Sequence, residues 1–159
     1  MTTAIDPDSL GLIPPETLAS MSGIELFRKM MAGELPGPPV QAITGQRMIE
    51  ADEGRVLWEA APPANFLNPM GGVHGGWAMT VLDSALACAV HSALQPGQGY
   101  TTLEAKVNLT RAPKVGETYR CEGRLLTLGR RTGTSEAKMT DTEGRVVAFA
   151  TTTCLVFPI

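Results

Sequence analysis

The sequence predicts an α+β fold in which a curved antiparallel sheet wraps around one long central helix, with a helical arm at the N-terminus. A long apolar stretch from His74 to about Leu94 carries no full charge except Asp83, which predicts a well-buried helix. Strand-like segments flank it, two before and four after, so strands do not alternate with helices as they would in a parallel α/β fold. One helix and one curved sheet leave an exposed face or edge, which favours an oligomer.

The first 37 residues are expected to form the arm, and residues 38–159 the main domain. Residues 1–20 contain three prolines and little periodic pattern, so we expect them to be disordered or packed on a partner subunit. Ser22 and Glu25 have the spacing of a capping box, which predicts a short helix directly after Ser22.

Residues 40–62 predict two strands joined by a turn at residues 52–55. The loop "PPANFLNPMGG" then leads into the central helix. The four later strands are expected within residues 100–112, 118–129, 132–141 and 145–157.

Composition excludes several classes of function. The 159 residues carry a formal net charge of −3, and the pair Arg130-Arg131 is the largest basic cluster, so nucleic acid and anionic membranes are not expected partners. The longest uncharged stretch is broken by proline, glycine pairs and Asp83, so it is not a membrane span. Three widely spaced cysteines show neither a metal-binding nor a disulfide pattern, which predicts a cytoplasmic protein without a metal site.

Two features of the central helix raise the question of chemistry. Asp83 has no neighbouring Lys or Arg in sequence, and an enclosed, unpaired carboxylate is costly, so it is either held by local hydrogen bonds or serves as a general base. Gly75 and Gly76 begin the helix, where free backbone amides bind an anion or a developing oxyanion. The alternative is that these glycines only permit close packing.

The spacing of these features predicts a shared site. Eight helical residues from Gly75 to Asp83 span about 12 Å, too far for both groups to act on one carbonyl. If both act on the same carbonyl, one of them comes from another subunit. A two-fold dimer with antiparallel helices would bring Gly75 of one chain near Asp83 of the other, twice.

The segment "LNPMGGVHGGWAMTVLDSALACA" resembles the hot-dog-fold thioesterases, and most of all their phenylacetic-acid-degradation (PaaI-like) branch. The resemblance extends over residues 40–158 and also includes "TTLEAKVNL", "GRRTG" and "DTEGRVVAFATTTCLV". It implies a hot-dog fold, hydrolysis of acyl-CoA thioesters without a separate cofactor, and a homodimer or homotetramer with sites at the subunit interface.

The resemblance also implies roles for single residues. Asp83 would be the general base that activates water, or the nucleophile. The Gly75 amide would polarise the thioester carbonyl, and Asn68 would orient the water or the carbonyl from the facing subunit. A hydroxyl at the start of the next strand would hold the water, and it falls on Thr102, with Thr101 as the alternative.

The remaining residues have supporting roles in this resemblance. His74 would shape the loop at the helix start, while His91 is expected to be structural. Gly76, Arg130 and Arg131 would contact coenzyme A, the two arginines through its phosphates. Solvent exposure alone explains the arginine pair nearly as well.

Three other functions share parts of this pattern. The "HGG" string is also found in the oxyanion loop of α/β-hydrolases, but the chain is too short for that fold and has no G-x-S-x-G motif. A hot-dog hydratase or dehydratase would pair a His with an acid. A non-catalytic acyl-CoA binding or sensor module would use the same pocket with little need for Asp83.

Overall fold

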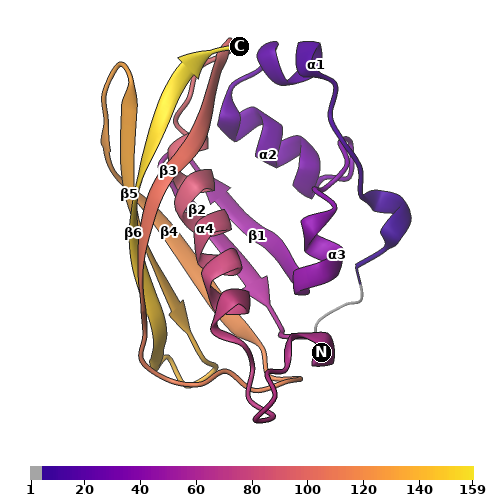
Figure 1. The fold of residues 1–159 in the computed structure, drawn as a ribbon. Helices are drawn as coiled ribbons and strands as arrows, with labels where there is room; N and C mark the ends of the chain where they lie inside the picture. Colours follow the sequence, from indigo (N-terminus) through magenta and orange to yellow (C-terminus); the bar gives the residue numbers. More distant parts are fainter. Residues whose placement is uncertain (1–4) are drawn as a thin grey trace.

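The computed structural model describes residues 5–159, in which a six-stranded sheet curves around a long helix, α4 (Figure 1). The strand order is β1-β2-β4-β5-β6-β3, and every neighbouring pair is antiparallel. The strands are β1 (Gln46–Asp52), β2 (Arg55–Ala60), β3 (Gln98–Leu109), β4 (Tyr119–Leu128), β5 (Thr132–Thr140) and β6 (Val146–Pro158). The helices are α1 (Pro15–Ala19), α2 (Gly23–Met31), α3 (Val40–Thr44) and α4 (Gly75–His91), with 3-10 turns η1 (Pro7–Ser9) and η2 (Ala64–Phe66). The predicted α+β fold is confirmed.

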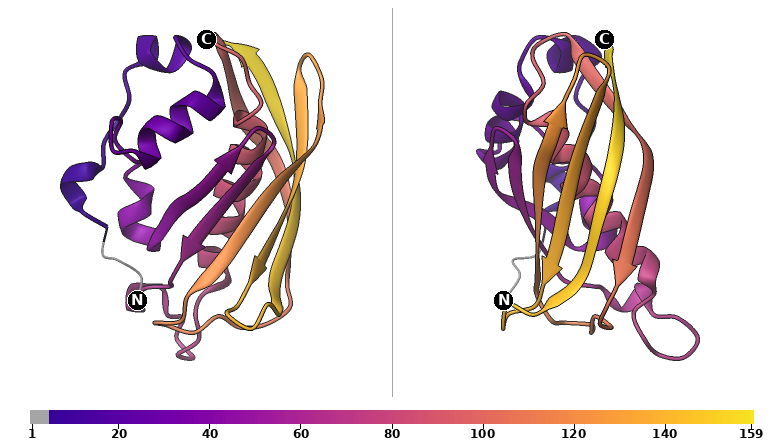
Figure 2. Two further views of the ribbon diagram at one scale, coloured as in Figure 1. Left: turned by 180° about the vertical axis from the view of Figure 1, so that it is seen from behind. Right: turned by 90° about the vertical axis from the view of Figure 1, so that its left-hand side faces the viewer.

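Helix α4 lies in the curve of the sheet and contacts β2, β3, β4, β5 and β6 (Figure 2). Its buried side chains, such as Leu82 and Leu86, join those of the inner sheet face, such as Cys121, in one hydrophobic core. At Gly123 of β4 the helix lies so close to the sheet that an added Cβ atom would overlap the Ala85 carbonyl oxygen. Glycine at this position therefore lets the helix settle against the sheet.

One side of α4 is not covered by its own sheet. Asp83 is exposed and Met79, one turn earlier, is 45% exposed. This side adjoins β3, an edge strand with exposed Leu103 and Leu109. The prediction of a well-buried helix is wrong along this side of α4 in the single chain, because the sheet ends at β3.

The arm packs on its own chain. Ile13 and Leu18 pack against the main core, and Ser22 caps α2 as predicted, with its hydroxyl oxygen accepting the Glu25 N–H at 3.4 Å. The expectation of disorder is therefore wrong for residues 5–20, because prolines interrupt the periodic pattern that would have indicated their apolar contacts. Packing of this segment on a partner subunit stays a prediction. Residues 1–4 lie outside the described residues.

Two element boundaries differ from the prediction. Residues 40–44 form α3 rather than the start of a strand, and Gly45, in the left-handed conformation with φ 66°, ends this helix before β1 begins. Helix α4 ends at His91, earlier than the predicted end near Leu94. The turn between β1 and β2 and the four later strands are confirmed.

Docking of α2 on the end of α4 covers most of His91. The ring of Phe27 in α2 lies 5.1 Å from the imidazole in an edge-to-face contact. The ring of Tyr100 in β3 lies 4.9 Å from the same imidazole. The Gly23 N–H donates to the Leu94 carbonyl at 3.0 Å. Burial lowers the pKa of His91 from 6.5 to about 4, so the residue is structural and neutral at physiological pH.

We therefore expect acid to destabilise the fold through His91. The unfolded chain takes up a proton near pH 6.5 and the folded chain only near pH 4, so the free energy of unfolding falls as pH drops through this window, by about 2 kcal/mol between pH 7 and pH 5. His91→Phe should remove most of this loss in urea unfolding measured at both pH values. His74→Gln, at the other of the two histidines, should keep the loss of stability at low pH. An equal loss in wild type and His91→Phe would contradict the assignment.

Candidate active site

Asp83 and Thr102 meet on the uncovered side of α4. The Thr102 hydroxyl donates to Asp83 Oδ1 at 3.1 Å. Thr102 pairs in register with the buried Cys154, so its side chain faces α4, whereas the neighbouring Thr101 is exposed and pairs with Leu155. Of the two candidate threonines, Thr102 is the one that contacts the carboxylate.

The start of α4 presents one free amide. The exposed His74 is the N-cap, and its Nδ1 accepts the Gly76 N–H at 2.9 Å. Because Nδ1 is the acceptor, the neutral imidazole carries its proton on Nε2. Within residues 5–159 the Gly75 N–H has no hydrogen-bond acceptor. The first turn therefore offers Gly75, and not Gly76, as the donor to a bound group.

Asn68 organises the loop that leads into α4. Its Oδ1 accepts the N–H groups of Met70 at 2.9 Å and Gly72 at 3.1 Å, and its own N–H donates to the Gly72 carbonyl at 2.8 Å. Its Nδ2 has no acceptor within the described chain, residues 5–159, so it can donate to a ligand. The Asn68 carboxamide is thus fixed through its Oδ1, while its Nδ2 is available as a hydrogen-bond donor.

Cys88 and Tyr100, which the sequence does not single out, lie near enough to Asp83 to feel its charge. Burial, with the nearby Asp83 carboxylate adding to it, raises the pKa of Cys88 to about 12. Burial also raises the pKa of Tyr100 well above its usual value. Both groups stay neutral at physiological pH, so neither competes as a thiolate or phenolate nucleophile. Tyr100 lies two residues before Thr102, and strand alternation is the signal that could have found it.

The predicted residues fall into three separate groups in the single chain. Asp83, in the middle of α4, lies beside Thr102 of β3, while Asn68, His74, Gly75 and Gly76 lie at or just before the start of α4. The exposed Arg130 and Arg131 form the turn between β4 and β5, at the other end of the sheet from Gly75 (Figure 1). Eight helical residues keep the Gly75 amide and the Asp83 carboxylate about 12 Å apart, so one chain does not place both on one carbonyl.

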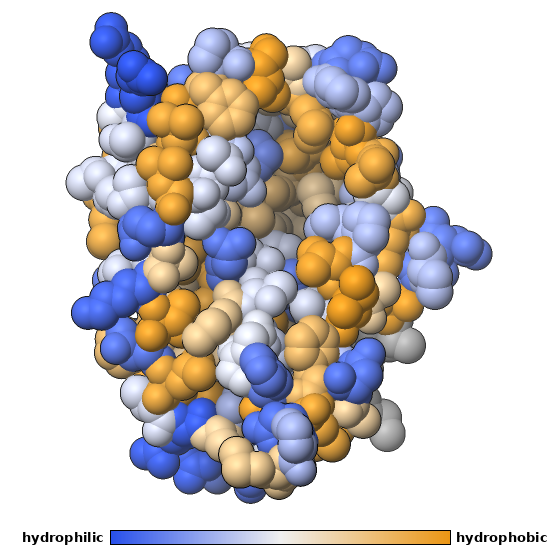
Figure 3. Space-filling model, viewed as in Figure 1, coloured by the Kyte–Doolittle hydropathy of each residue, from blue (hydrophilic) through white to orange (hydrophobic). Residues whose placement is uncertain are grey.

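The uncovered side of α4 opens onto a hollow in the molecular surface. Figure 3 shows this hollow between the edge of the sheet at β3 and the arm helices, with hydrophobic and polar side chains around it. In the described part of the chain no three His, Cys, Asp or Glu side chains gather closely enough to hold a metal ion. No helix in residues 5–159 is long and apolar enough to cross a membrane.

A single long helix in the curve of an antiparallel sheet defines the hot-dog fold. Here Asp83 of the helix is paired with Thr102 of β3, and a free amide lies at the helix start. The model of the thioesterase superfamily matches residues 70–148, which hold this helix and most of the later strands. The chain belongs to this superfamily, as a thioester hydrolase of the PaaI-like branch.

Solved structures support the same assignment. A phenylacetic acid degradation-related protein from Ralstonia eutropha JMP134 is 30% identical, with a TM-score of 0.75 over 81% of this chain and 98% of that one. A Streptococcus mutans UA159 protein bound to acetyl-CoA is 27% identical, with a TM-score of 0.66 over 71% and 89% of the two chains. A hypothetical thioesterase from Streptococcus pneumoniae TIGR4, solved with coenzyme A, is 27% identical, with a TM-score of 0.68 over 75% and 91%. No curated protein matches the chain.

Proposed function

We propose that the protein hydrolyses acyl-CoA thioesters to the free acid and coenzyme A. The observation that carries the proposal is the hydrogen bond between Thr102 and Asp83, which places a hydroxyl and a carboxylate together on the open side of α4. The two Streptococcus relatives bind coenzyme A or acetyl-CoA, which supports coenzyme A as the carrier of the acyl group. Coenzyme A then belongs to the substrate, and no separate cofactor takes part.

In the proposed reaction Asp83 takes a proton from a water molecule held by Thr102, and the water oxygen attacks the thioester carbonyl. The Gly75 N–H stabilises the oxyanion that forms. Collapse of this intermediate breaks the carbon–sulfur bond, and the thiolate leaves with the proton as coenzyme A. Attack by Asp83 itself, through an anhydride that water then opens, is the alternative. Asn68 would orient the water or the carbonyl through its Nδ2.

The proposed site is shared between two subunits. The 12 Å spacing of Gly75 and Asp83 requires a second chain, and the open side of α4 with its exposed Met79 and the free edge of β3 supplies a surface for it. A two-fold axis across this surface gives two equal sites per homodimer, and a homotetramer would hold two such dimers.

Arg130 and Arg131 would bind the coenzyme A phosphates, since both are exposed and guanidinium groups suit phosphate geometry. Gly76 is a weaker candidate for contact with coenzyme A, because His74 already accepts its N–H. Three free cysteines in the described residues support a reducing location, and we place the reaction in the cytoplasm.

Thiol release from a panel of thioesters tests the proposal. The panel contains acetyl-, hexanoyl-, decanoyl-, benzoyl- and phenylacetyl-CoA, and the acyl group hydrolysed fastest names the preferred class. Binding of these thioesters without thiol release would instead establish a binding or sensor module. Water addition to an enoyl-CoA without thiol release would establish a hydratase, although His74 Nδ1 is already occupied by the Gly76 N–H.

Mixing two inactive variants tests the shared site. Asp83→Asn and Gly75→Pro each remove one half of it, so each homodimer should be inactive. Random mixing makes half of the dimers heterodimers, and each heterodimer has one intact site, so about a quarter of the wild-type activity should return. Co-expression with two affinity tags isolates the heterodimer for the assay. If both groups came from one subunit, the purified heterodimer would stay as inactive as its parents.

A further inference from the structure

The first turn of α4 is held in place by Trp77. This side chain is fully buried, and its indole N–H donates to the Thr44 carbonyl at 2.8 Å. The carbonyl belongs to the last residue of α3, which is followed by the left-handed Gly45. Trp77 is two residues after Gly75, so a shift of the indole moves the backbone that carries the free Gly75 amide.

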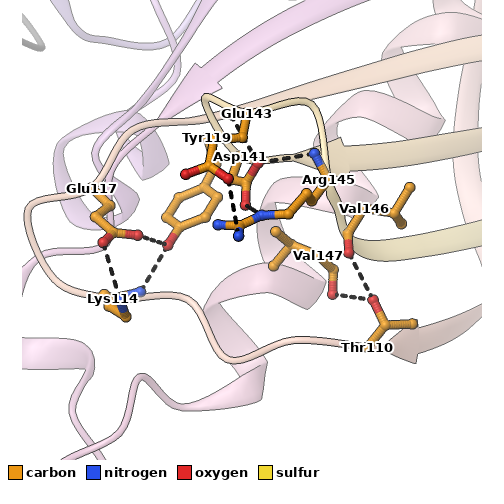
Figure 4. Close-up of polar contacts among 9 residues, drawn as sticks. All are labelled: Thr110, Lys114, Glu117, Tyr119, Asp141, Glu143, Arg145, Val146 and Val147. Carbon is orange, nitrogen blue, oxygen red and sulfur yellow. Dashed lines mark hydrogen bonds and ion pairs between the residues drawn. The ribbon is translucent and has the colours of Figure 1, made fainter.

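Tyr119 supports Trp77 from the sheet. The two rings lie 5.8 Å apart at 67°, an edge-to-face contact. The Tyr119 hydroxyl donates to Glu117 Oε2 at 2.8 Å and accepts the Lys114 N–H at 2.9 Å, so two hydrogen bonds fix the hydroxyl end of the ring (Figure 4). This support comes from a part of the chain far from α4 in sequence.

The end of β3 holds the same turn from a second direction. The Thr110 hydroxyl lies within hydrogen-bond distance of the Val146 and Val147 carbonyls, at 3.1 and 3.0 Å, and ties β3 to β6 (Figure 4). Leu109, the preceding residue, contacts Gly75 so closely that a Cβ atom there would lie 2.7 Å from Leu109 Cδ1. The Gly75 backbone is therefore confined between Leu109 and the Trp77 anchor.

We propose that Trp77 is the positioning residue for the Gly75 amide, acting through its hydrogen bond to Thr44 and its contact with Tyr119. This inference rests on the proposed function, in which the Gly75 N–H stabilises the oxyanion. A donor that acts in the transition state must lie within a narrow distance of the oxygen, and displacement by about 1 Å costs up to 100-fold in rate. Trp77 itself is buried and touches no substrate.

Trp77→Phe and Trp58→Phe form a matched pair of variants. Both tryptophans are buried in the same core, at 0% and 2% exposure. The Trp58 indole N–H has no partner within residues 5–159, so Trp58→Phe removes similar volume without breaking a hydrogen bond. We expect Trp77→Phe to lower kcat by about 10- to 100-fold with KM within about threefold, and Trp58→Phe to leave kcat within about twofold. Equal effects on kcat in the two variants would overturn the proposal.

Nuclear magnetic resonance relaxation of the Gly75 amide gives a readout that does not depend on activity. The order parameter should fall from about 0.85 to below about 0.6 in Trp77→Phe and stay high in Trp58→Phe. If wild type hydrolyses no thioester, the proposed function fails while this measurement still decides the positioning role, and an unchanged order parameter overturns it. If Trp77→Phe does not fold, Tyr119→Phe is the substitute, because it removes only the hydroxyl that fixes the ring against Trp77. We expect this variant to lower the order parameter of the Gly75 amide in the same way and to lower kcat about threefold to tenfold. No change in Tyr119→Phe would then overturn the proposal.

Discussion

Asp83→Asn is expected to lower kcat/KM for the best thioester by about 100- to 1000-fold, the loss typical of removing a general base. The asparagine Oδ1 can still accept the Thr102 hydroxyl, so the local packing is kept and only the basic group is lost. The change is therefore in chemistry, and circular dichroism should match that of wild type.

Thiol release at saturating and limiting substrate measures this loss. Asp52→Asn is the control, since Asp52 is exposed at the end of β1 and forms only an ion pair with Arg55 at 3.6 Å. It should keep wild-type activity. Activity of Asp83→Asn within about threefold of wild type would mean that the carboxylate is structural and the mechanism wrong.

Gly75→Pro is expected to lower kcat by about 100- to 1000-fold, because proline has no N–H to stabilise the oxyanion. Proline suits the first position of a helix, and His74 before it already has the extended backbone, ψ 134°, that proline requires. Loss of activity would thus not stem from loss of the helix.

Gly75→Ala separates the missing amide from the added carbon. Both variants place a Cβ atom 2.7 Å from Leu109 Cδ1, the flexible end of a side chain, but alanine keeps the N–H. We expect Gly75→Ala to lose about tenfold or less. If the alanine and proline variants lose the same activity, crowding at Leu109 explains the effect and the amide does not act as the oxyanion donor.

The central helix could be predicted from the sequence, because a long apolar stretch with Asp83 as its one full charge is typical of a largely buried helix. The sequence also led to Thr102, through the resemblance to a family. Strand alternation then separates Thr102 from Thr101, as the register with Cys154 confirms. These features depend on the order of residues within one segment, which can be read directly from the sequence.

Other features depend on contacts that a local pattern does not contain. The exposure of Asp83 follows from the sheet ending at β3, which is a property of the whole topology. Helix α3 was missed because Val40 and Ile43 favour strands and only the flanking Pro39 and Gly45 favour a short helix. Histidine is an uncommon N-cap, so the contact of His74 with Gly76 was not foreseen.

The two edges of the sheet differ in a way that limits how far copies of the chain can add to one another. Helices α2 and α3 pack against β1. In residues 5–159 neither of these two helices packs in this way against β3, the strand at the other edge. Lateral growth therefore has a single available direction, and the two-fold contact proposed at β3 would occupy it. We expect the chain to form particles of fixed size and to resist growth into fibres, even at high concentration.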